Sequence, residues 1–195
     1  IISSGMATKE ELQEAITLLR ENGCTQICML KCTSAYPAKP EEANLITIKD
    51  MIKSFNVIGG LSDHTLGIEV PLASISLGAK IIEKHFTLSR SSGSADDAFS
   101  ITPDEFKHMV DSIRIIEKTI GNVTYGGVKN EGVSKKFRKS LFAVEDIKKG
   151  EVFTTKNVRP IRPGYGIHTK YYEIILGKES KLDIERGEPI RKDYW

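Results

Sequence analysis

Residues 56–86, NVIGGLSDHTLGIEVPLASISLGAKIIEKHF, contain a complete strand–helix–strand pattern. The runs NVIGGLS and AKIIEKHF, at the two ends, are short and apolar, which is typical of buried strands. Between them Ile68, Leu72 and Ile75 recur at helical spacing, and Gly78 marks the predicted end of that helix. A strand, a helix and a strand in this order form a right-handed unit with parallel strands, so the stretch predicts an α/β fold.

The same alternation continues toward the N-terminus. Thr8 and Glu11 predict a capping box, and the run QICMLKC at 26–32 is apolar enough for a buried strand. Two further helices are therefore predicted, one on each side of this strand. Their apolar faces comprise Leu12, Ala15, Ile16 and Leu19 in the first, and Leu45, Ile48, Ile52 and Phe55 in the second.

Downstream, Thr102, Pro103 and Glu105 predict the start of a long helix with the apolar stripe Phe106, Val110, Ile113 and Ile120. Strand and helix thus alternate four times in the first 120 residues. Four such units are half of a (β/α)8 TIM barrel, which needs roughly 250 residues. We therefore expect the C-terminal half of a barrel, in a chain that is a C-terminal fragment or one partner of a split protein. The alternative is a small open α/β sheet that begins at Ile1.

The pattern changes after the last predicted helix. Residues 121–139 are glycine-rich, polar and basic, as in a linker, and short strands and turns follow. DIKKGEVF at Asp146 resembles DIERGEPI at Asp183, and a glycine in each copy suits a turn. We therefore predict half of a barrel at 1–120, a linker at 121–139, and a small, mostly β module with pseudo-symmetry at 140–195.

Composition excludes several classes of protein. Of the 195 residues, 39% are hydrophobic and 28% are charged, as in soluble globular proteins. The net charge of +2 does not indicate a nucleic-acid partner, and no apolar run is long enough to cross a bilayer. Cys24, Cys28 and Cys32 are odd in number and suggest reduced thiols, so the expected compartment is the cytoplasm.

Ile1 and Ile2 predict the end of a fourth strand, and polar residues follow all four predicted strands. Two of these polar residues are histidines, His64 and His85. Adjacent parallel strands lie about 5 Å apart, which lets both imidazoles reach one divalent ion. With no third protein ligand visible, such a site would be open and catalytic. A strand-end histidine is also commonly a structural, hydrogen-bonded residue, so the pattern leaves both interpretations open. The nearby hydroxyls suit either phosphate binding or helix capping: Ser3, Ser4, Thr33 and Ser62.

Several motifs together resemble the sialic acid synthase family, whose members make nonulosonic acids from phosphoenolpyruvate. They are LKCTSAYPAKPEEANL, GLSDHTLG, IIEKHFT, ADDAFSITPDEF and RPIRPGYGIHTKYYEIILGK. The resemblance covers the whole chain but only about the last half of the family's length. It implies the C-terminal half of a TIM barrel followed by an SAF, or antifreeze-like, domain. Within the family, LKCTSAYP and DDAFS are most similar to pseudaminic acid synthases.

The resemblance implies a role for eight residues. His64 and His85 match the catalytic ligands of a divalent metal, usually Mn2+, with Mg2+ or Co2+ as alternatives. Ser3, Ser34 and Ser62 match positions that contact phosphoenolpyruvate, although N-acetylneuraminate synthases more often have asparagine where Ser34 stands. Tyr36 and Asp96 match residues that contact the sugar. Arg162 matches an arginine that reaches the other subunit's sugar in a domain-swapped homodimer.

The implied reaction joins C3 of phosphoenolpyruvate to C1 of an open-chain 6-deoxy diacetamido sugar, giving pseudaminic acid and phosphate. The nearest alternatives change only the sugar, and give N-acetylneuraminate or legionaminate. An alternative of another class is a non-catalytic, truncated fragment that binds sugar or supports assembly.

Overall fold

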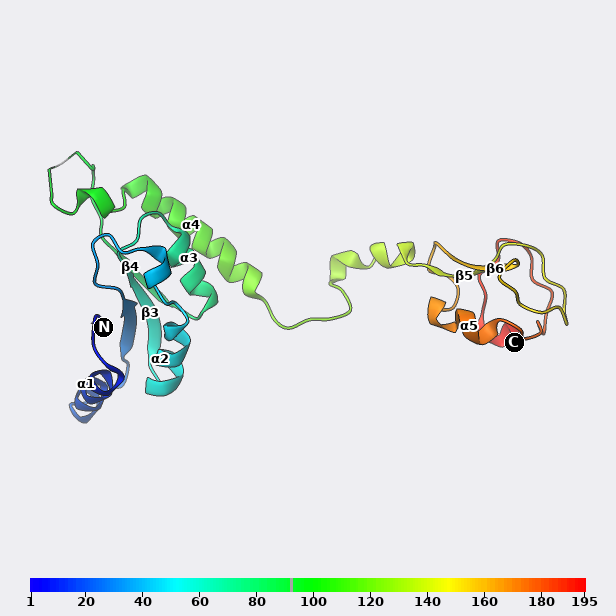
Figure 1. Ribbon diagram of the computed structural model, residues 1–195, viewed down its shortest axis with the longest axis horizontal. Coiled ribbons are helices and arrows are strands. Elements are labelled where there is room, and N and C mark those ends of the chain that lie inside the picture. Colours follow the sequence, from blue (N-terminus) through cyan, green and yellow to red (C-terminus); the bar gives the residue numbers. More distant parts are fainter. Residues whose placement is uncertain (92) are drawn as a thin grey trace. The chain divides into compact units, whose positions relative to one another are not determined.

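The computed structural model describes residues 1–91 and 93–195, which form two compact units. The first unit comprises Ile1–Asn122 and the second comprises Val123–Trp195. Figure 1 shows a parallel sheet with flanking helices in the first unit, and short strands with long connections in the second.

The first unit is built on a four-stranded parallel sheet with the order β1-β2-β3-β4. Its strands are β1 (Ile2–Ser3), β2 (Cys28–Cys32), β3 (Ile58–Asp63) and β4 (Ile81–Lys84). In the register, Ser62 lies between Cys32 of β2 and Glu83 of β4. The predicted α/β class with parallel strands is confirmed, and the register brings the polar strand ends to one edge of the sheet.

Four helices connect or follow these strands: α1 (Lys9–Glu21), α2 (Thr47–Phe55), α3 (Glu69–Ser76) and α4 (Pro103–Ile120). The capping boxes predicted for α1 and α4 are both present, with Thr8 and Glu11 at one and Thr102 and Glu105 at the other. Met29 of β2 is buried in a cluster with α1 and α2, and Leu61 of β3 is buried in a cluster with α3 and α4. These two clusters form the core between sheet and helices.

The stripe predicted for α4 is wrong in part. Met109 and Ile113 are the buried residues of this helix, whereas Val110 is half-buried and Ile120 is 55% exposed. Phe106 and Ile116 pack against the same core cluster. The apolar packing therefore ends one turn before the helix does, because no described core residue of the first unit covers its last turn.

A close approach between strands depends on Gly60. A Cβ at this position would lie 2.4 Å from the Leu30 side chain and 2.7 Å from the carbonyl oxygen of Ile81. The second of these atoms is backbone and cannot move aside. Glycine thus lets the central strand β3 pack tightly between its neighbours.

The second unit contains an antiparallel pair, β5 (Ser140–Ala143) and β6 (Val158–Ile161), and the short helix α5 (Tyr172–Ile175). Its core includes Leu141, Phe153 and Ile190, all fully buried. Short 3-10 helices lie at Lys129–Glu131, Ser134–Phe137, Thr169–Tyr171 and Lys192–Tyr194, and two more lie in the first unit at Pro40–Glu42 and Asp97–Phe99. Two of these lie within the stretch 121–139 that we interpreted as a linker.

The predicted pseudo-symmetry is present in the backbone. Ile147 and Ile184 exchange both of their backbone hydrogen bonds, at 2.8 Å each. The N–H of Lys149 donates to Asp183 Oδ1 at 2.7 Å, and the N–H of Arg186 donates to Asp146 Oδ1 at 2.8 Å. The two copies of the repeat therefore pair with one another. The glycines that follow, at 150 and 187, have φ of +86° and +93°, which explains the choice of glycine.

Among the described residues, no helix combines the length and the apolar character that crossing a membrane requires. Cys24, Cys28 and Cys32 are free thiols.

Candidate functional site

The loops that follow β2, β3 and β4 bring three aromatic rings together. His64 directly follows β3, His85 directly follows β4, and Tyr36 lies in the loop after β2. The ring centroids of His64 and His85 are 5.2 Å apart. The ring of Tyr36 lies 4.3 Å from that of His64 and 5.7 Å from that of His85. The structure thus assembles three of the predicted site residues at the carboxyl edge of the sheet.

Asp96 and Phe99 complete this group from the segment between β4 and α4. Asp96 Oδ2 lies 3.4 Å from Nδ1 of His85, and its side chain is 54% exposed. Phe99 is buried, and its ring centroid lies 5.0 Å from that of His85 and 5.8 Å from that of Tyr36. The sequence analysis did not select Phe99, although it stands in the motif that supplied Asp96. We call these five residues the histidine site.

Hydrogen bonding orients the two imidazoles. Nδ1 of His64 lies 2.8 Å from the carbonyl oxygen of Thr33. A carbonyl only accepts, so Nδ1 carries the proton and Nε2 keeps its lone pair. The carboxylate of Asp96 favours the same tautomer for His85. Both histidines therefore offer Nε2 as a ligand, and each has the carbonyl or carboxylate partner that metal-binding histidines commonly have.

The separation of the two rings fits a shared metal ion. An imidazole centroid lies about 3.2 Å from a metal bound at Nε2, so two such rings stand about 4.5–5.2 Å apart for ligand angles of about 90° to 109°. The observed 5.2 Å lies within this range. Within the described part of the chain, no group of three or more His, Cys, Asp or Glu side chains could hold a metal. The two histidines alone leave coordination positions open.

A buried ion pair supports both histidines from the helix-facing side of the sheet. Lys84 Nζ donates to Asp63 Oδ2 at 2.5 Å, and both side chains are only 2% exposed. The ammonium also donates to the carbonyl of Thr65, whose own N–H donates to Asp63 Oδ1 at 3.1 Å. Asp63 and Lys84 immediately precede His64 and His85. The pair therefore fixes the two backbone segments that carry the imidazoles, a role that the sequence did not reveal.

Ser62 and Glu83 occupy the opposite face of the same two strands. Ser62 Oγ donates to Glu83 Oε1 at 2.7 Å, and Ser62 is buried while Glu83 is exposed. Strand alternation puts them on the opposite face from Asp63 and Lys84. The hydroxyl predicted to contact a substrate is therefore held by a carboxylate for which the sequence indicated no role.

The other two predicted serines lie at the ends of β1 and β2. Ser3 is exposed, and its neighbour Ser4 is buried and accepts a hydrogen bond from the Cys32 N–H at 3.0 Å. Ser34 is exposed, with its Oγ 3.7 Å from Cys32 Sγ. Ser4 therefore has a structural role, whereas Ser3 and Ser34 are exposed residues at the strand ends.

Lys31 is a second polar residue that the sequence analysis passed over, because it stands in the apolar run of β2. Its Nζ donates to the carbonyl of Cys32 at 2.8 Å and to Thr33 Oγ1 at 3.3 Å. Burial lowers the pKa of this lysine.

Arg162, the last predicted site residue, belongs to the second unit, where it directly follows β6 and is exposed.

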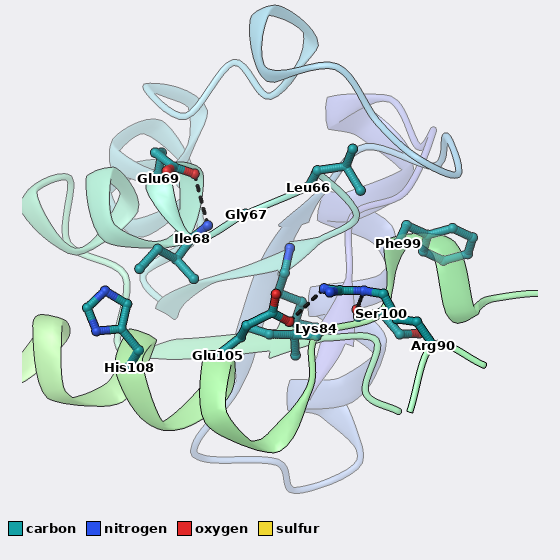
Figure 2. Close-up of a pocket in the computed structure, with 11 residues that line it drawn as sticks. Leu66, Gly67, Ile68, Glu69, Lys84, Arg90, Phe99, Ser100, Glu105 and His108 are labelled. Atoms are coloured by element: carbon teal, nitrogen blue, oxygen red, sulfur yellow. Dashed lines mark hydrogen bonds and ion pairs between the residues drawn. The ribbon is translucent and has the colours of Figure 1, made fainter. Parts of the chain in front are cut away.

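A cavity of about 280 Å³ lies beside the histidine site and shares Phe99 with it. Figure 2 shows the Arg90 guanidinium meeting the Glu105 carboxylate across this cavity, with His108 of α4 on its wall. Arg90 Nη2 donates to Glu105 Oε2 at 2.6 Å. His108 is exposed. The Lys84 and Arg90 cations are both paired here, so the cavity has little free charge with which to hold a ligand.

The chain thus combines a parallel α/β unit that carries two histidines at its strand ends with a small β module that follows it in the sequence. The NeuB family model matches residues 1–125, and the SAF domain model matches residues 138–193. The chain belongs to the NeuB family. These two matches fit part of a barrel followed by a small β domain, as the sequence predicted.

Several curated relatives are named as synthases of nonulosonic acids. The chain is 42% identical to a pseudaminic acid synthase of Campylobacter jejuni, over 98% of this chain and 56% of that protein. It is 40% identical to an N,N'-diacetyllegionaminic acid synthase of the same species, over 98% of this chain and 58% of that protein. The chain thus spans little more than half the length of these relatives.

A solved structure shares the fold across the whole chain. The crystal structure of the spore coat polysaccharide biosynthesis protein SpsE from Bacillus subtilis matches with a TM-score of 0.58 and 34% identity, over 99% of this chain and 60% of that one. An N-acetylneuraminic acid synthetase from Leptospira borgpetersenii matches with a TM-score of 0.62 and 31% identity, over 68% of this chain and 47% of that one.

Proposed function

We propose that the chain is part of an enzyme that condenses phosphoenolpyruvate with an open-chain 6-deoxy diacetamido sugar to give pseudaminic acid and phosphate. The observation that carries this proposal is the pair of imidazoles, 5.2 Å apart, at the carboxyl edge of a parallel sheet. Ligands bind at that edge in α/β folds. The relatives named as pseudaminic acid synthases support the choice of reaction.

His64 and His85 would hold a divalent metal, with Mn2+ as the first choice and Mg2+ or Co2+ as alternatives. When bound, the ion would act as a Lewis acid on the sugar aldehyde, whose oxygen gains negative charge as the carbon–carbon bond forms. Neutral imidazole ligands leave the charge of such an ion undiminished. The carbonyl of Thr33 and the carboxylate of Asp96 keep both rings in the tautomer that binds through Nε2.

The hydroxyls of Ser3, Ser34 and Ser62 would bind phosphoenolpyruvate and hold its C3 toward the aldehyde, so their contribution is mainly orientation. Ser62 is already held in place by Glu83 at 2.7 Å. Tyr36 and Asp96, both exposed beside the histidines, would contact the sugar.

Arg162 would act from a different subunit. Its family counterpart serves the other subunit's sugar, so we propose a domain-swapped homodimer in which the second unit of one chain covers the first unit of its partner. The exposed position of Arg162, directly after β6, leaves its guanidinium available for this contact.

A closely related function changes only the sugar. Identity to an N,N'-diacetyllegionaminic acid synthase is 40%, against 42% for a pseudaminic acid synthase, so legionaminate is the second candidate product and N-acetylneuraminate is the third. Phosphate release separates the first candidate from the third, measured on the chain together with any coding sequence that adjoins it, with Mn2+ or with chelator. We expect metal-dependent release with 2,4-diacetamido-2,4,6-trideoxy-L-altrose. Release with N-acetylmannosamine would favour the sialic acid branch, and release with neither sugar would contradict the proposal.

A further inference from the structure

The second unit contains a hollow of about 240 Å³ lined by basic side chains. Its lining includes Lys135, Arg138, Lys139 and His168. No carboxylate lines the hollow, and none of these three cations belongs to an ion pair found among the described residues. We call this feature the basic hollow. Its charge differs from that of the cavity beside the histidine site, where the cations are paired.

Hydrogen bonds of the backbone and of the Ser140 hydroxyl hold the walls of the basic hollow in place. Ser140, which is buried, donates from Oγ to the Pro163 carbonyl at 2.7 Å and accepts from the Gly166 N–H at 2.9 Å. The Gly164 N–H donates to the Lys136 carbonyl at 2.9 Å. A Cβ at Gly166 would lie 2.3 Å from the Leu141 carbonyl oxygen, so the chain there requires glycine. The segments that carry Arg138 and His168 are therefore held in fixed proximity.

The hydrogen bonds of His168 define its tautomer. Nδ1 accepts from the backbone N–H of Lys170 at 3.1 Å, and a backbone N–H can only donate. Nδ1 therefore has no proton, and Nε2 carries it. Nη2 of Arg138 lies 3.4 Å from this Nε2, and a guanidinium nitrogen also only donates. Two donors 3.4 Å apart cannot pair with each other, and an acceptor oxygen within hydrogen-bond distance of both would satisfy both.

We propose that the basic hollow binds an oxyanion, with one oxygen bridging Arg138 and His168 and the charges of Lys135 and Lys139 nearby. Charge-assisted hydrogen bonds of this kind are the strong ones, and a planar guanidinium suits phosphate and carboxylate groups alike. The shared chemistry is an oxygen acceptor with negative charge, carried by a phosphate or by a carboxylate. All residues of the basic hollow belong to the second unit, so this oxyanion site does not depend on the proposed synthase activity.

The test is NMR of the histidine ring nitrogens in the full chain. The 15N spectrum should show the neutral Nε2–H tautomer for His168. Inorganic phosphate, added at constant ionic strength, should shift the His168 signals to saturation. Acetate in a parallel titration separates the two sources: saturation with both indicates a general oxyanion site, and saturation with phosphate alone indicates a phosphate site. The Nδ1–H tautomer, or shifts that do not saturate with either anion, would overturn the proposal.

Matched variants distinguish a specific anion site in the basic hollow from nonspecific attraction of anions to positive charge. Arg138→Gln should weaken phosphate binding at least about tenfold, because it removes a charge-assisted hydrogen bond. His168→Asn keeps an acceptor for the Lys170 N–H and loses the Nε2 donor, so it should weaken binding several-fold. Arg186→Gln removes the same charge outside the basic hollow and should leave binding unchanged. Equal weakening of phosphate binding by Arg138→Gln and Arg186→Gln would contradict the proposed site. If His168→Asn does not fold, the comparison of Arg138→Gln with Arg186→Gln is the test.

Discussion

Replacing Lys84 by methionine tests whether the buried ion pair holds the histidine site together. The side chains of Lys84 and Asp63 are each 2% exposed, and Lys84 Nζ lies 2.5 Å from Asp63 Oδ2. Methionine fills a similar volume but leaves the Asp63 carboxylate buried without its cation. Breaking a buried pair by removing one partner costs about 3–5 kcal/mol. We expect Lys84→Met to lower the free energy of unfolding of the first unit by this amount.

Two spectroscopic signals separate the two units in one experiment. Helices α1–α4 belong to the first unit, so circular dichroism at 222 nm follows mainly that unit. The single tryptophan, Trp195, belongs to the second unit, so its fluorescence follows that one. For a unit of this size, about 3–5 kcal/mol corresponds to a fall in Tm of about 10–20 °C. We expect this fall in the dichroism transition and no change in the fluorescence transition.

Two controls make this prediction specific. Lys107→Met removes the same side chain from an exposed pair with Asp111 and should not change either transition. Asp63→Asn combined with Lys84→Met removes both charges and should recover part of the loss, because no unpaired charge then stays buried. A Lys84→Met protein as stable as the Lys107→Met protein would refute the structural role of the pair.

Four further substitutions test the metal site, the pKa of Glu105 and the packing at Gly60. His64→Ala and His85→Ala should each abolish metal-dependent turnover and weaken Mn2+ binding measured by calorimetry; full activity of either variant would rule out the metal assignment. The hydrogen bond from Arg90 lowers the pKa of Glu105 to about 2, so its contribution to stability is complete above pH 4.5 and is lost as the pH falls toward 2. Denaturation of Glu105→Gln should therefore differ from the parent above pH 4.5 and converge with it near pH 2; a constant difference would contradict the pKa shift. Gly60→Ala should destabilise the first unit by about 1–3 kcal/mol in urea denaturation, because its Cβ would meet a neighbouring backbone carbonyl at 2.7 Å, and an unchanged midpoint would show that the strands can separate there.

The fold could be predicted from the sequence because hydrophobic periodicity and capping residues are local signals. The Thr8–Glu11 capping box and the strand–helix–strand unit of residues 56–86 are present as expected. The error at Ile120 has a different origin. Periodicity shows which face of a helix is apolar, but it does not show where the neighbouring elements stop covering that face.

The site could be predicted only in part. The paired histidines were visible because both follow apolar strands that the pattern made neighbours. Their supports were hidden, because the Asp63–Lys84 pair joins residues 21 positions apart through the register of β3 and β4. The partner of His168 was hidden for the same reason, because Arg138 stands 30 positions away in the sequence.

The most direct test of the proposed function is mass spectrometry of the product formed from phosphoenolpyruvate labelled with 13C at all three carbons. It would use 2,4-diacetamido-2,4,6-trideoxy-L-altrose, Mn2+ and the chain with any adjoining coding sequence. A carbon–carbon condensation predicts one product that contains the whole sugar and all three labelled carbons, formed in step with phosphate. Labelled pyruvate together with unchanged sugar would show simple phosphate hydrolysis, and would contradict the assignment of this chain to a nonulosonic acid synthase.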